Sequence, residues 1–169
     1  MKLFTGFLFA FSFLLITSCD TGTPEKAAEY NDNLLATLDQ LDETIQEMDD
    51  TFISYVPEEM NKAYDALKNQ VAATQKELED LGKYYGDARL QEAALGYVKA
   101  VEESLPLYTE RIKIESVSDD EFTDEMGDRS FEISDDIYAK IDVANKKLIE
   151  VQKQFSADHK YDLENRPAK

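Results

Sequence analysis

The sequence predicts an all-α protein, an antiparallel up-down-up-down four-helix bundle with a long last helix. Apolar residues recur every three or four positions over most of residues 24–160, which is the period of one helix face. No useful stretch alternates apolar and polar residues as a half-buried strand would. Short breaks near 55–57, 82–86 and 115–118 would make neighbouring helices antiparallel. A helical hairpin that dimerises would bury the same apolar positions and is the alternative.

The first two predicted helices are separated by Pro57. Thr23 followed by Pro24 is typical of an N-cap and a first helical position. Pro57 begins the second helix, and Gly82 is expected to end it. The apolar stripes contain Ala27, Tyr30, Leu34, Leu38, Leu41, Ile45, Met48 and Phe52 in the first helix, and Met60, Tyr64, Leu67, Val71, Thr74, Leu78 and Leu81 in the second.

The third and fourth helices complete the bundle. Asp87 is expected to cap the third helix, and Pro106 to bend it or end it a turn early. Ser118 and Glu121 have the spacing of a capping box, which predicts a fourth helix over 119–157, a rod of about 60 Å that bends or projects. Residues 161–169 are expected to form a flexible tail. The stripes contain Leu90, Ala94, Tyr97, Val101, Leu105, Tyr108 and Ile112, then Phe122, Met126, Ile133, Ile137, Ala144, Leu148, Val151 and Phe155.

The amino terminus, residues 1–18, has the character of a secretory signal peptide. After Lys2, residues 3–16 form an almost wholly apolar run, shorter than the roughly 20 residues that a membrane-spanning helix needs. The run ends in Ile16-Thr17-Ser18-Cys19, which resembles a bacterial lipobox. The resemblance implies cleavage between Ser18 and Cys19, diacylglyceryl and palmitate-type lipid on Cys19, and a tether over 19–23. The alternative is an uncleaved anchor followed by an incidental cysteine.

Lipid on Cys19 would fix both the location and the orientation of the protein. Two or three acyl chains, at about 0.8 kcal/mol per buried methylene, give stable membrane anchoring. The anchored membrane is either the cell membrane or the outer membrane, with the bundle in the periplasm or at the cell surface. Because the lipid precedes the first helix, the 82–86 turn and the C-terminus are expected to face the membrane. The 55–57 and 115–118 turns are then expected at the far tip.

The composition excludes several classes of function. The chain carries 36 Asp and Glu against 18 Lys and Arg, a net charge of −18, which would repel nucleic acid and disfavours docking on anionic lipid through a basic face. With one cysteine, one histidine and no tryptophan, it lacks the residues for a zinc finger or a Cys–His pair. The single histidine has no partners in a Ser–His–Asp pattern, and the sequence contains no glycine-rich phosphate loop. We therefore expect no enzyme, no metal site and no cofactor.

Three features of the sequence are candidate sites. The acidic stretch 119–128 lacks the spacing of a calcium loop and is interpreted as helix capping and solvation. His159, near the end of the last helix, is interpreted as a favourable charge at a helix C-terminus. Tyr84 and Tyr85 lie at a turn, where exposed tyrosines are good anchors for protein contacts. They are the candidate partner-binding residues.

Four short segments carry a resemblance to a known family. They are Glu29-Tyr30-Asn31-Asp32, Pro57-Glu58-Glu59-Met60, residues 86–95 (GDARLQEAAL) and Phe155-Ser156-Ala157. With these segments, the region after Cys19 resembles small surface lipoproteins of unknown function from Bacteroidota and spirochaetes. The resemblance implies a helical, lipobox-anchored protein and supplies no activity.

These observations lead to one functional expectation and one alternative. We expect a membrane-tethered, non-enzymatic module of the cell envelope, anchored through lipid on Cys19, that binds an envelope protein and no nucleic acid. The alternative is a lipoprotein that binds a small ligand or a cation in a cavity between its helices. A tightly packed bundle with an exposed aromatic patch would favour the first.

Overall fold

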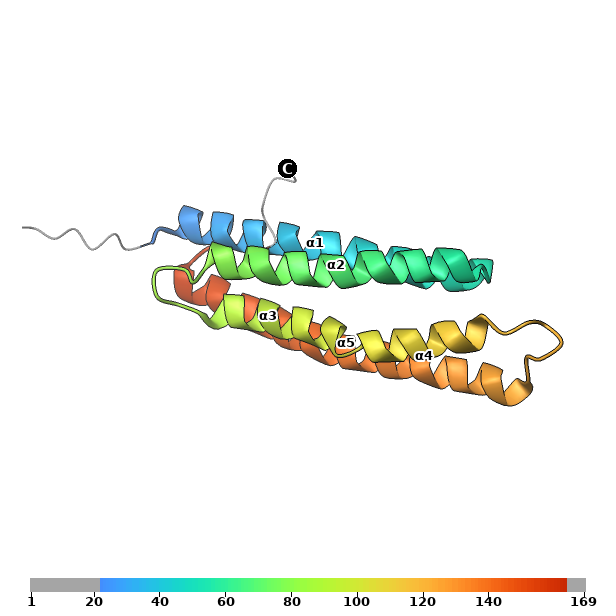
Figure 1. Ribbon diagram of the computed structural model, residues 1–169. Helices are drawn as coiled ribbons and strands as arrows, with labels where there is room; N and C mark the ends of the chain where they lie inside the picture. The colour runs from blue at the N-terminus through green and yellow to red at the C-terminus, as the bar shows by residue number, and fades with distance from the viewer. Residues whose placement is uncertain (1–21, 164–169) are drawn as a thin grey trace, which may run out of the picture.

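The computed structural model describes residues 22–163, which form five helices joined by turns and loops (Figure 1). The helices are α1 (Pro24–Ser54), α2 (Pro57–Leu81), α3 (Arg89–Glu102), α4 (Leu105–Glu115) and α5 (Asp124–His159). Within this described part there is no strand, only an isolated bridge between Tyr84 and Asp87. The predicted all-α fold is confirmed. The signal peptide, Ser18 and Cys19 lie outside the described residues.

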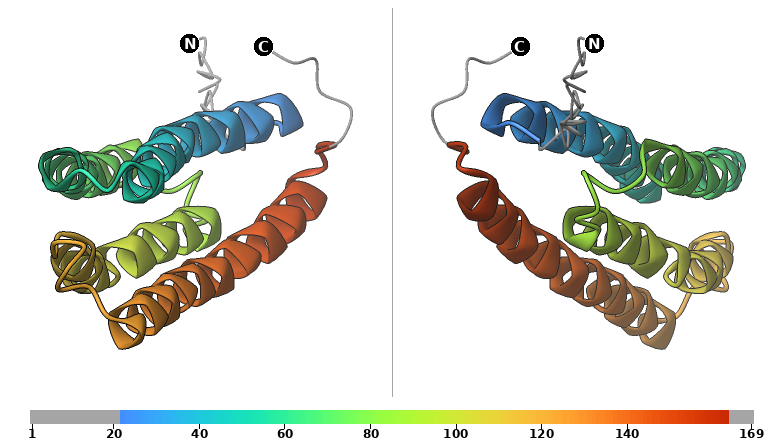
Figure 2. Two further views of the ribbon diagram at one scale, coloured as in Figure 1. Left: turned by 90° about the vertical axis from the view of Figure 1, so that its right-hand side faces the viewer. Right: turned by 90° about the vertical axis from the view of Figure 1, so that its left-hand side faces the viewer.

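The helices form two antiparallel hairpins stacked in two layers (Figure 2). One layer is α1 with α2, and the other is α3 and α4 against the long, bowed α5. Helices α3 and α4 follow one another in line and together occupy the place of the predicted third helix. This arrangement is the predicted bundle, except that the predicted third helix is divided into α3 and α4.

Most helix ends lie where the sequence places them. The Thr23 hydroxyl accepts a hydrogen bond from the Lys26 backbone N–H at 3.3 Å, so Thr23 caps α1 as predicted. Gly82 ends α2 with φ 68°, a conformation that glycine adopts without strain. Pro106 is the second residue of α4, and α3 has already ended at Glu102. The predicted interruption at Pro106 is therefore confirmed.

The predicted start of the last helix is wrong. Ser118 does bond the Glu121 carboxylate, at 3.1 Å, but only within a turn. Helix α5 begins five residues later than predicted, at Asp124, and Thr123 caps it by accepting from the Met126 N–H at 3.3 Å. Acidic residues follow both Ser118 and Thr123, so this local feature does not distinguish the two caps. The 36 residues of α5 give a rod of about 54 Å.

One continuous core joins the two layers. Nearly all of the predicted stripe positions are buried or partly buried in it, so a single chain covers its own apolar faces. Phe122 is the exception, at 38% exposed. Tyr161, expected in a flexible tail, instead packs against Phe155 with the ring centroids 6.1 Å apart. The largest fully buried side chains are Tyr108, Phe155, Leu34, Leu41, Met48, Met60, Leu67, Leu78, Leu90, Ile133, Ile137 and Val98.

Along α1 the two hairpins are joined by hydrogen bonds. Asp49 accepts from Tyr138 of α5 at 2.8 Å and from the buried Tyr108 of α4 at 3.4 Å. Further towards the start of α1, Gln152 of α5 donates to the buried Asn31 at 3.0 Å. Burial raises the pKa of Asp49, against the opposing effect of the Tyr138 hydrogen bond. These bonds fix how α1 lies along the second hairpin.

None of the helices within residues 22–163 combines the length and the apolar character that crossing a bilayer requires.

Replacing Asp49 with Asn is expected to raise the free energy of unfolding near pH 7. Because the folded-state pKa of Asp49 lies above its unfolded value, the protonated carboxyl stabilises the fold at low pH, and this contribution is lost as the pH rises through the folded-state pKa. Asparagine keeps an acceptor for Tyr138 and Tyr108 and cannot ionise. Urea denaturation followed by circular dichroism from pH 4 to 7 measures the change.

The neighbouring variant Asp50→Asn is the matched control, since Asp50 is exposed and loses the same charge. It should follow the wild-type pH dependence within about 0.5 kcal/mol. Equal flattening of the pH dependence in both variants would show that total charge, and not the buried Asp49 carboxyl, is responsible.

Candidate functional site

The bundle has two ends of different character. The base is the end formed by the start of α1, the 82–88 loop and the end of α5; the tip is formed by the turn at Tyr55–Val56 and the 116–123 loop (Figure 1). The predicted placement of the turns at opposite ends is confirmed. Which end faces a membrane depends on Cys19 and stays a prediction.

The base is closed by a cluster of aromatic rings from three parts of the chain. Tyr84 of the 82–88 loop lies with its ring centroid 5.4 Å from that of Tyr30, 5.5 Å from Phe155 and 4.9 Å from His159. The Tyr30 hydroxyl donates to the Gly82 carbonyl at 2.7 Å. These rings fill the end of the core and leave no open cleft among themselves, since Tyr84 is only 5% exposed.

The expectation that Tyr84 is exposed is therefore wrong. Its hydroxyl donates to the Thr23 carbonyl at 3.0 Å, and a Cβ atom added to Gly22 would overlap that same hydroxyl. Tyr84 thus holds the chain against the base at the point where it enters α1. The turn position suggested exposure, but the chain preceding α1 returns to cover this residue.

Tyr85 remains on the surface, at 49% exposed. Its backbone has φ 45°, and Lys26 of α1 donates to its hydroxyl at 3.0 Å with the ammonium 5.6 Å from the ring centroid. The two predicted partner-binding tyrosines thus have different surroundings: Tyr84 packs in the core and Tyr85 against Lys26. Of the two tyrosines, only Tyr85 is accessible from the surface.

A charged network lies beside the aromatic cluster. The Asp87 carboxylate accepts from the Arg89 guanidinium at 2.6 Å and lies 3.1 Å from Nε2 of His159, while Arg89 also pairs with Asp158 at 2.8 Å. Asp87 was predicted to cap α3, but the N-cap is Ala88, without a side-chain capping bond; Asp87 precedes it and accepts from the Arg89 backbone N–H at 3.1 Å. The hydrogen bonds from Arg89 hold the pKa of Asp87 well below its usual range, and the His159 contact acts in the same direction. The network fastens the end of α5 to the 82–88 loop.

The contact between Asp87 and His159 joins residues 72 positions apart. No spacing in the sequence signals it, because it depends on how the two hairpins stack. His159 was expected to act through the helix C-terminus alone. In the structure it packs 4.3 Å from Phe155, between ring centroids, so its imidazole also belongs to the core at the base.

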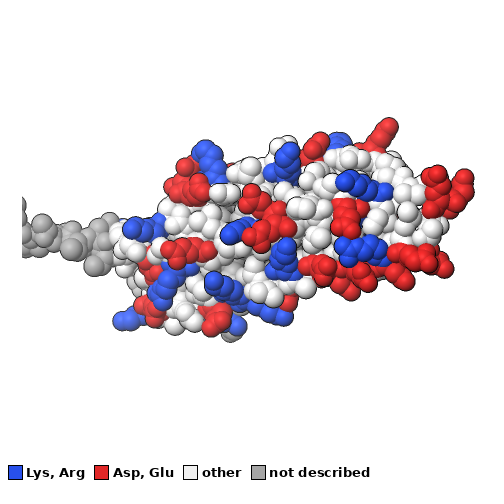
Figure 3. All heavy atoms as spheres, turned by 60° about the horizontal axis from the view of Figure 1, so that its bottom comes forward, with Lys and Arg blue, Asp and Glu red and all other residues white. Residues whose placement is uncertain are grey.

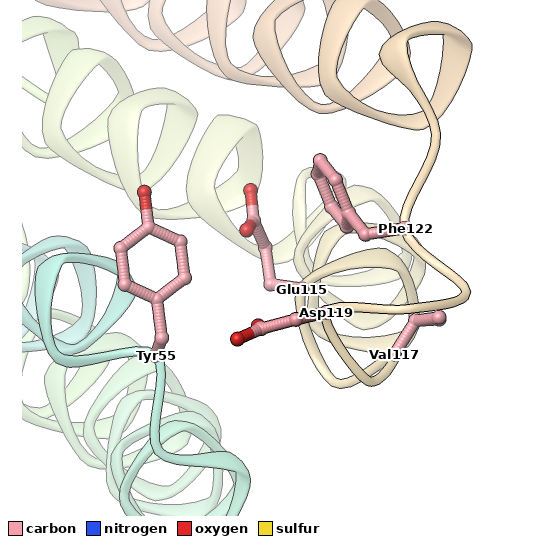
Figure 4. Close-up of a pocket in the computed structure, with 5 residues that line it drawn as sticks. All are labelled: Tyr55, Glu115, Val117, Asp119 and Phe122. Carbon is pink, nitrogen blue, oxygen red and sulfur yellow. The ribbon is translucent and has the colours of Figure 1, made fainter.

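The tip, in contrast, leaves apolar side chains exposed. Tyr55 is 67% and Ile53 77% exposed, and Val56 and Phe122 lie on the same end. A hollow of about 210 Å³ opens between the two loops and is lined by Tyr55, Glu115, Val117, Asp119 and Phe122 (Figure 4). Tyr55 and Phe122 stand on its two sides, with the carboxylates of Glu115 and Asp119 between them.

The floor of this hollow is held in place by hydrogen bonds. Ser130 of α5 donates to the Glu115 carboxylate and accepts from Nε of Arg111 at 3.3 Å. The Arg111 guanidinium lies 3.9 Å from the Phe52 ring centroid, which is a cation–π contact. Glu115 is therefore fixed through Ser130, whereas Asp119 belongs to the surface loop.

Tyr55 has an unusual backbone for its residue type. It ends α1 in the left-handed region, with φ 55° and ψ 26°, where glycine is preferred, and Gly82 occupies the corresponding position of α2. A residue with a side chain loses about 1–2 kcal/mol in this conformation. The exposed Tyr55 side chain recovers little of this by burial.

The two segments that frame the hollow are acidic in sequence. Residues 114–128 contain seven Asp or Glu and residues 49–59 contain four, and neither segment contains Lys, Arg or His. In Figure 3 acidic side chains are most crowded at the right-hand end, with a few basic side chains beside them. Within residues 22–163, no cluster of three or more His, Cys, Asp or Glu has the geometry of a metal site.

Two further hollows lie in grooves between helices. One, of about 340 Å³, follows α1 and α2 beside Glu47, Thr51 and Lys62; the other, of about 370 Å³, follows α2 and the α3–α4 junction beside Tyr64, Gln75 and Leu105. Both are lined mainly by exposed or half-exposed side chains, with Val71 the one buried lining residue. Neither brings together buried polar groups as a small-molecule site usually does.

No family model, curated protein or solved structure matches this chain. The resemblance to small surface lipoproteins therefore stays a prediction. The fold and its two ends define a class by themselves: a two-hairpin helical bundle with a packed aromatic base and an acidic tip that exposes apolar side chains.

Replacing Asp87 with Asn is expected to lower the free energy of unfolding at pH 7 by about 1–3 kcal/mol, because Arg89 and His159 lose a charged partner. The folded-state pKa of Asp87 is lowered, so its ionised form stabilises the fold above the unfolded pKa of about 3.9, and this contribution is lost as the pH falls through the lower folded-state value. The difference between variant and wild type should shrink on acidification. Urea denaturation at pH 7 and below pH 4 measures it.

Asp80→Asn is the control, since Asp80 makes only an exposed pair with Lys76 and should change stability by less than about 0.5 kcal/mol. If Asp87→Asn changed the free energy of unfolding as little as Asp80→Asn, the charged network at the base would not contribute to stability.

Proposed function

We propose that the protein is a lipid-anchored, non-enzymatic interaction module of the bacterial envelope that binds a partner protein at its tip. The single observation that carries this proposal is the hollow at the tip, where the exposed rings of Tyr55 and Phe122 stand on either side of two carboxylates. Exposed apolar patches bounded by polar residues are typical of protein interaction sites. The lipobox-like segment ending at Cys19 supplies the anchor.

The position of the tip agrees with this role. Cys19 precedes Thr23 by four residues, a span of at most about 14 Å, so lipid on Cys19 would keep the base close to the membrane. Helix α5 has a length of about 54 Å, and it would carry the tip that far from the bilayer surface. A partner in the surrounding space would then meet the tip before the base.

One feature favours the second candidate, a lipoprotein that binds a small cationic ligand. The carboxylates of Glu115 and Asp119 both line the hollow and would attract a positive group. The volume of about 210 Å³ lies below the roughly 300–1,000 Å³ usual for small-molecule sites, and the hollow is framed by loops rather than enclosed between helices. A protein partner is therefore the better-supported candidate.

Replacing Cys19 with Ala is expected to abolish incorporation of an alkyne-labelled palmitate fed to the native cells, because the acylated thiol is lost. Ser18→Ala keeps a small residue before the cysteine and is the control that should retain the label. In-gel fluorescence of the immunoprecipitated protein measures both. Label that persists in Cys19→Ala would contradict the anchor.

A photo-crosslinking amino acid placed at Ile53 on the tip is expected to capture an envelope protein in intact cells. The control places the same group at Val143 on α5, which is 69% exposed against 77% for Ile53 and lies away from both loops. Immunoblotting and mass spectrometry identify the crosslinked band. A band of equal yield from Val143, or none from Ile53, would contradict a binding role for the tip.

A further inference from the structure

We infer that the tip binds a positively charged polypeptide segment that inserts one apolar side chain between Tyr55 and Phe122. The inference rests on the proposed function and names the chemistry of its partner. It combines three observations: the size of the hollow, the two aromatic rings on its sides and the charge of the two segments that frame it.

The size of the hollow suits one side chain. At about 210 Å³ it is smaller than the roughly 300–1,000 Å³ of typical small-molecule sites. Its walls come from both hairpins, Tyr55 from the α1–α2 turn and Phe122 from the loop before α5 (Figure 4). An aromatic or aliphatic side chain placed between these rings would cover the exposed apolar surface on both.

The charge around the hollow selects the rest of the segment. Eleven acidic residues lie in 49–59 and 114–128, the two stretches that contain its lining residues, and they outnumber the three basic residues beside them, Arg111, Lys113 and Arg129. Charge complementarity of this kind steers partners to an interface and excludes those of like charge. It disfavours nucleic acid, anionic lipid and a second copy of this chain, whose net charge is −18. A segment rich in Lys or Arg on either side of the inserted residue matches it.

Tyr55 is the residue that distinguishes binding from folding. It is exposed, and its left-handed backbone would suit glycine better, so the fold does not need its ring. Phe122 is less suitable as a probe, because its ring also contacts the first turn of α5 near Gly127.

The test presents a phage library of random 12-residue peptides to the full-length lipidated protein in phosphatidylcholine nanodiscs, whose headgroups carry no net charge. Enriched peptides are expected to be net positive and to contain an aromatic or aliphatic residue. The most enriched peptide, labelled with a fluorophore, is then titrated by anisotropy. Its affinity should fall at least tenfold in Tyr55→Gly and be retained in Tyr55→Phe.

Three controls test whether a loss of affinity in Tyr55→Gly reflects the binding site rather than lost stability or any tyrosine-to-glycine exchange. The thermal midpoint of Tyr55→Gly should equal or exceed that of the wild type, because glycine relieves the left-handed backbone. Tyr85→Gly makes the same exchange at the base, where Tyr85 also has a positive φ, and should leave the peptide affinity within twofold. Replacing the apolar residue of the peptide with serine should weaken binding at least tenfold.

Several results would overturn the inference: no enrichment over empty nanodiscs, enriched peptides that are neutral or acidic, or affinity that survives Tyr55→Gly. Unchanged affinity of the serine-substituted peptide would show that the tip binds by charge alone and does not take up an apolar side chain. A partner crosslinked at Ile53 together with any of these results would leave the proposed function standing and remove only the chemistry assigned to the partner. Crosslinking equal at Val143 would remove the proposed function itself.

Discussion

Burial of one apolar stripe per helix is the constraint on which the rest of this structure depends. Each helix of the bundle is polar over most of its surface, so none is stable alone, and each hairpin still leaves part of its stripe uncovered. Stacking the two hairpins closes the core and fixes the two ends of the molecule. The 82–88 loop and the ends of α1 and α5 meet at the base, while the other two connections meet at the tip. The sites at both ends are consequences of that stacking.

The end of the core is covered at the base and left partly uncovered at the tip. At the base, aromatic rings from α1, α5 and the 82–88 loop fill the end of the core, and the Asp87 network holds them together. At the tip, apolar side chains extend past the last core layer into solvent, among carboxylates that repel one another. A packed, neutralised base and an open, charged tip suit a protein held at one end that meets its partners at the other. Tyr55 at the tip, like Tyr85 at the base, keeps a backbone that glycine would occupy with less strain.

The hydrogen bonds along α1 fix the register in which the two hairpins stack. Apolar stripes alone would tolerate sliding of one hairpin along the other, because one layer of Leu and Ile resembles the next. The bonds from Tyr138 and Tyr108 to Asp49 and from Gln152 to Asn31 can form in one register only. Partly buried polar groups of this kind stabilise weakly but penalise the alternatives, since a shifted register would leave them without partners. They also hold the α1–α2 turn opposite the 116–123 loop, which is the arrangement that forms the hollow.

By itself the sequence determined everything that depends on local period and local caps. The apolar spacing specified the helices, Thr23, Pro57 and Gly82 specified their ends, and Pro106 specified the break between α3 and α4. The start of α5 was misplaced because Ser118 and Thr123 are both good local caps, and the sequence alone does not rank them. Only the tertiary structure decided that Tyr84 is buried, that His159 meets Asp87 and that Tyr55 faces Phe122 across a hollow. Each of these depends on pairs of residues far apart in the chain, and their proximity follows from how two hairpins stack, which no local pattern encodes.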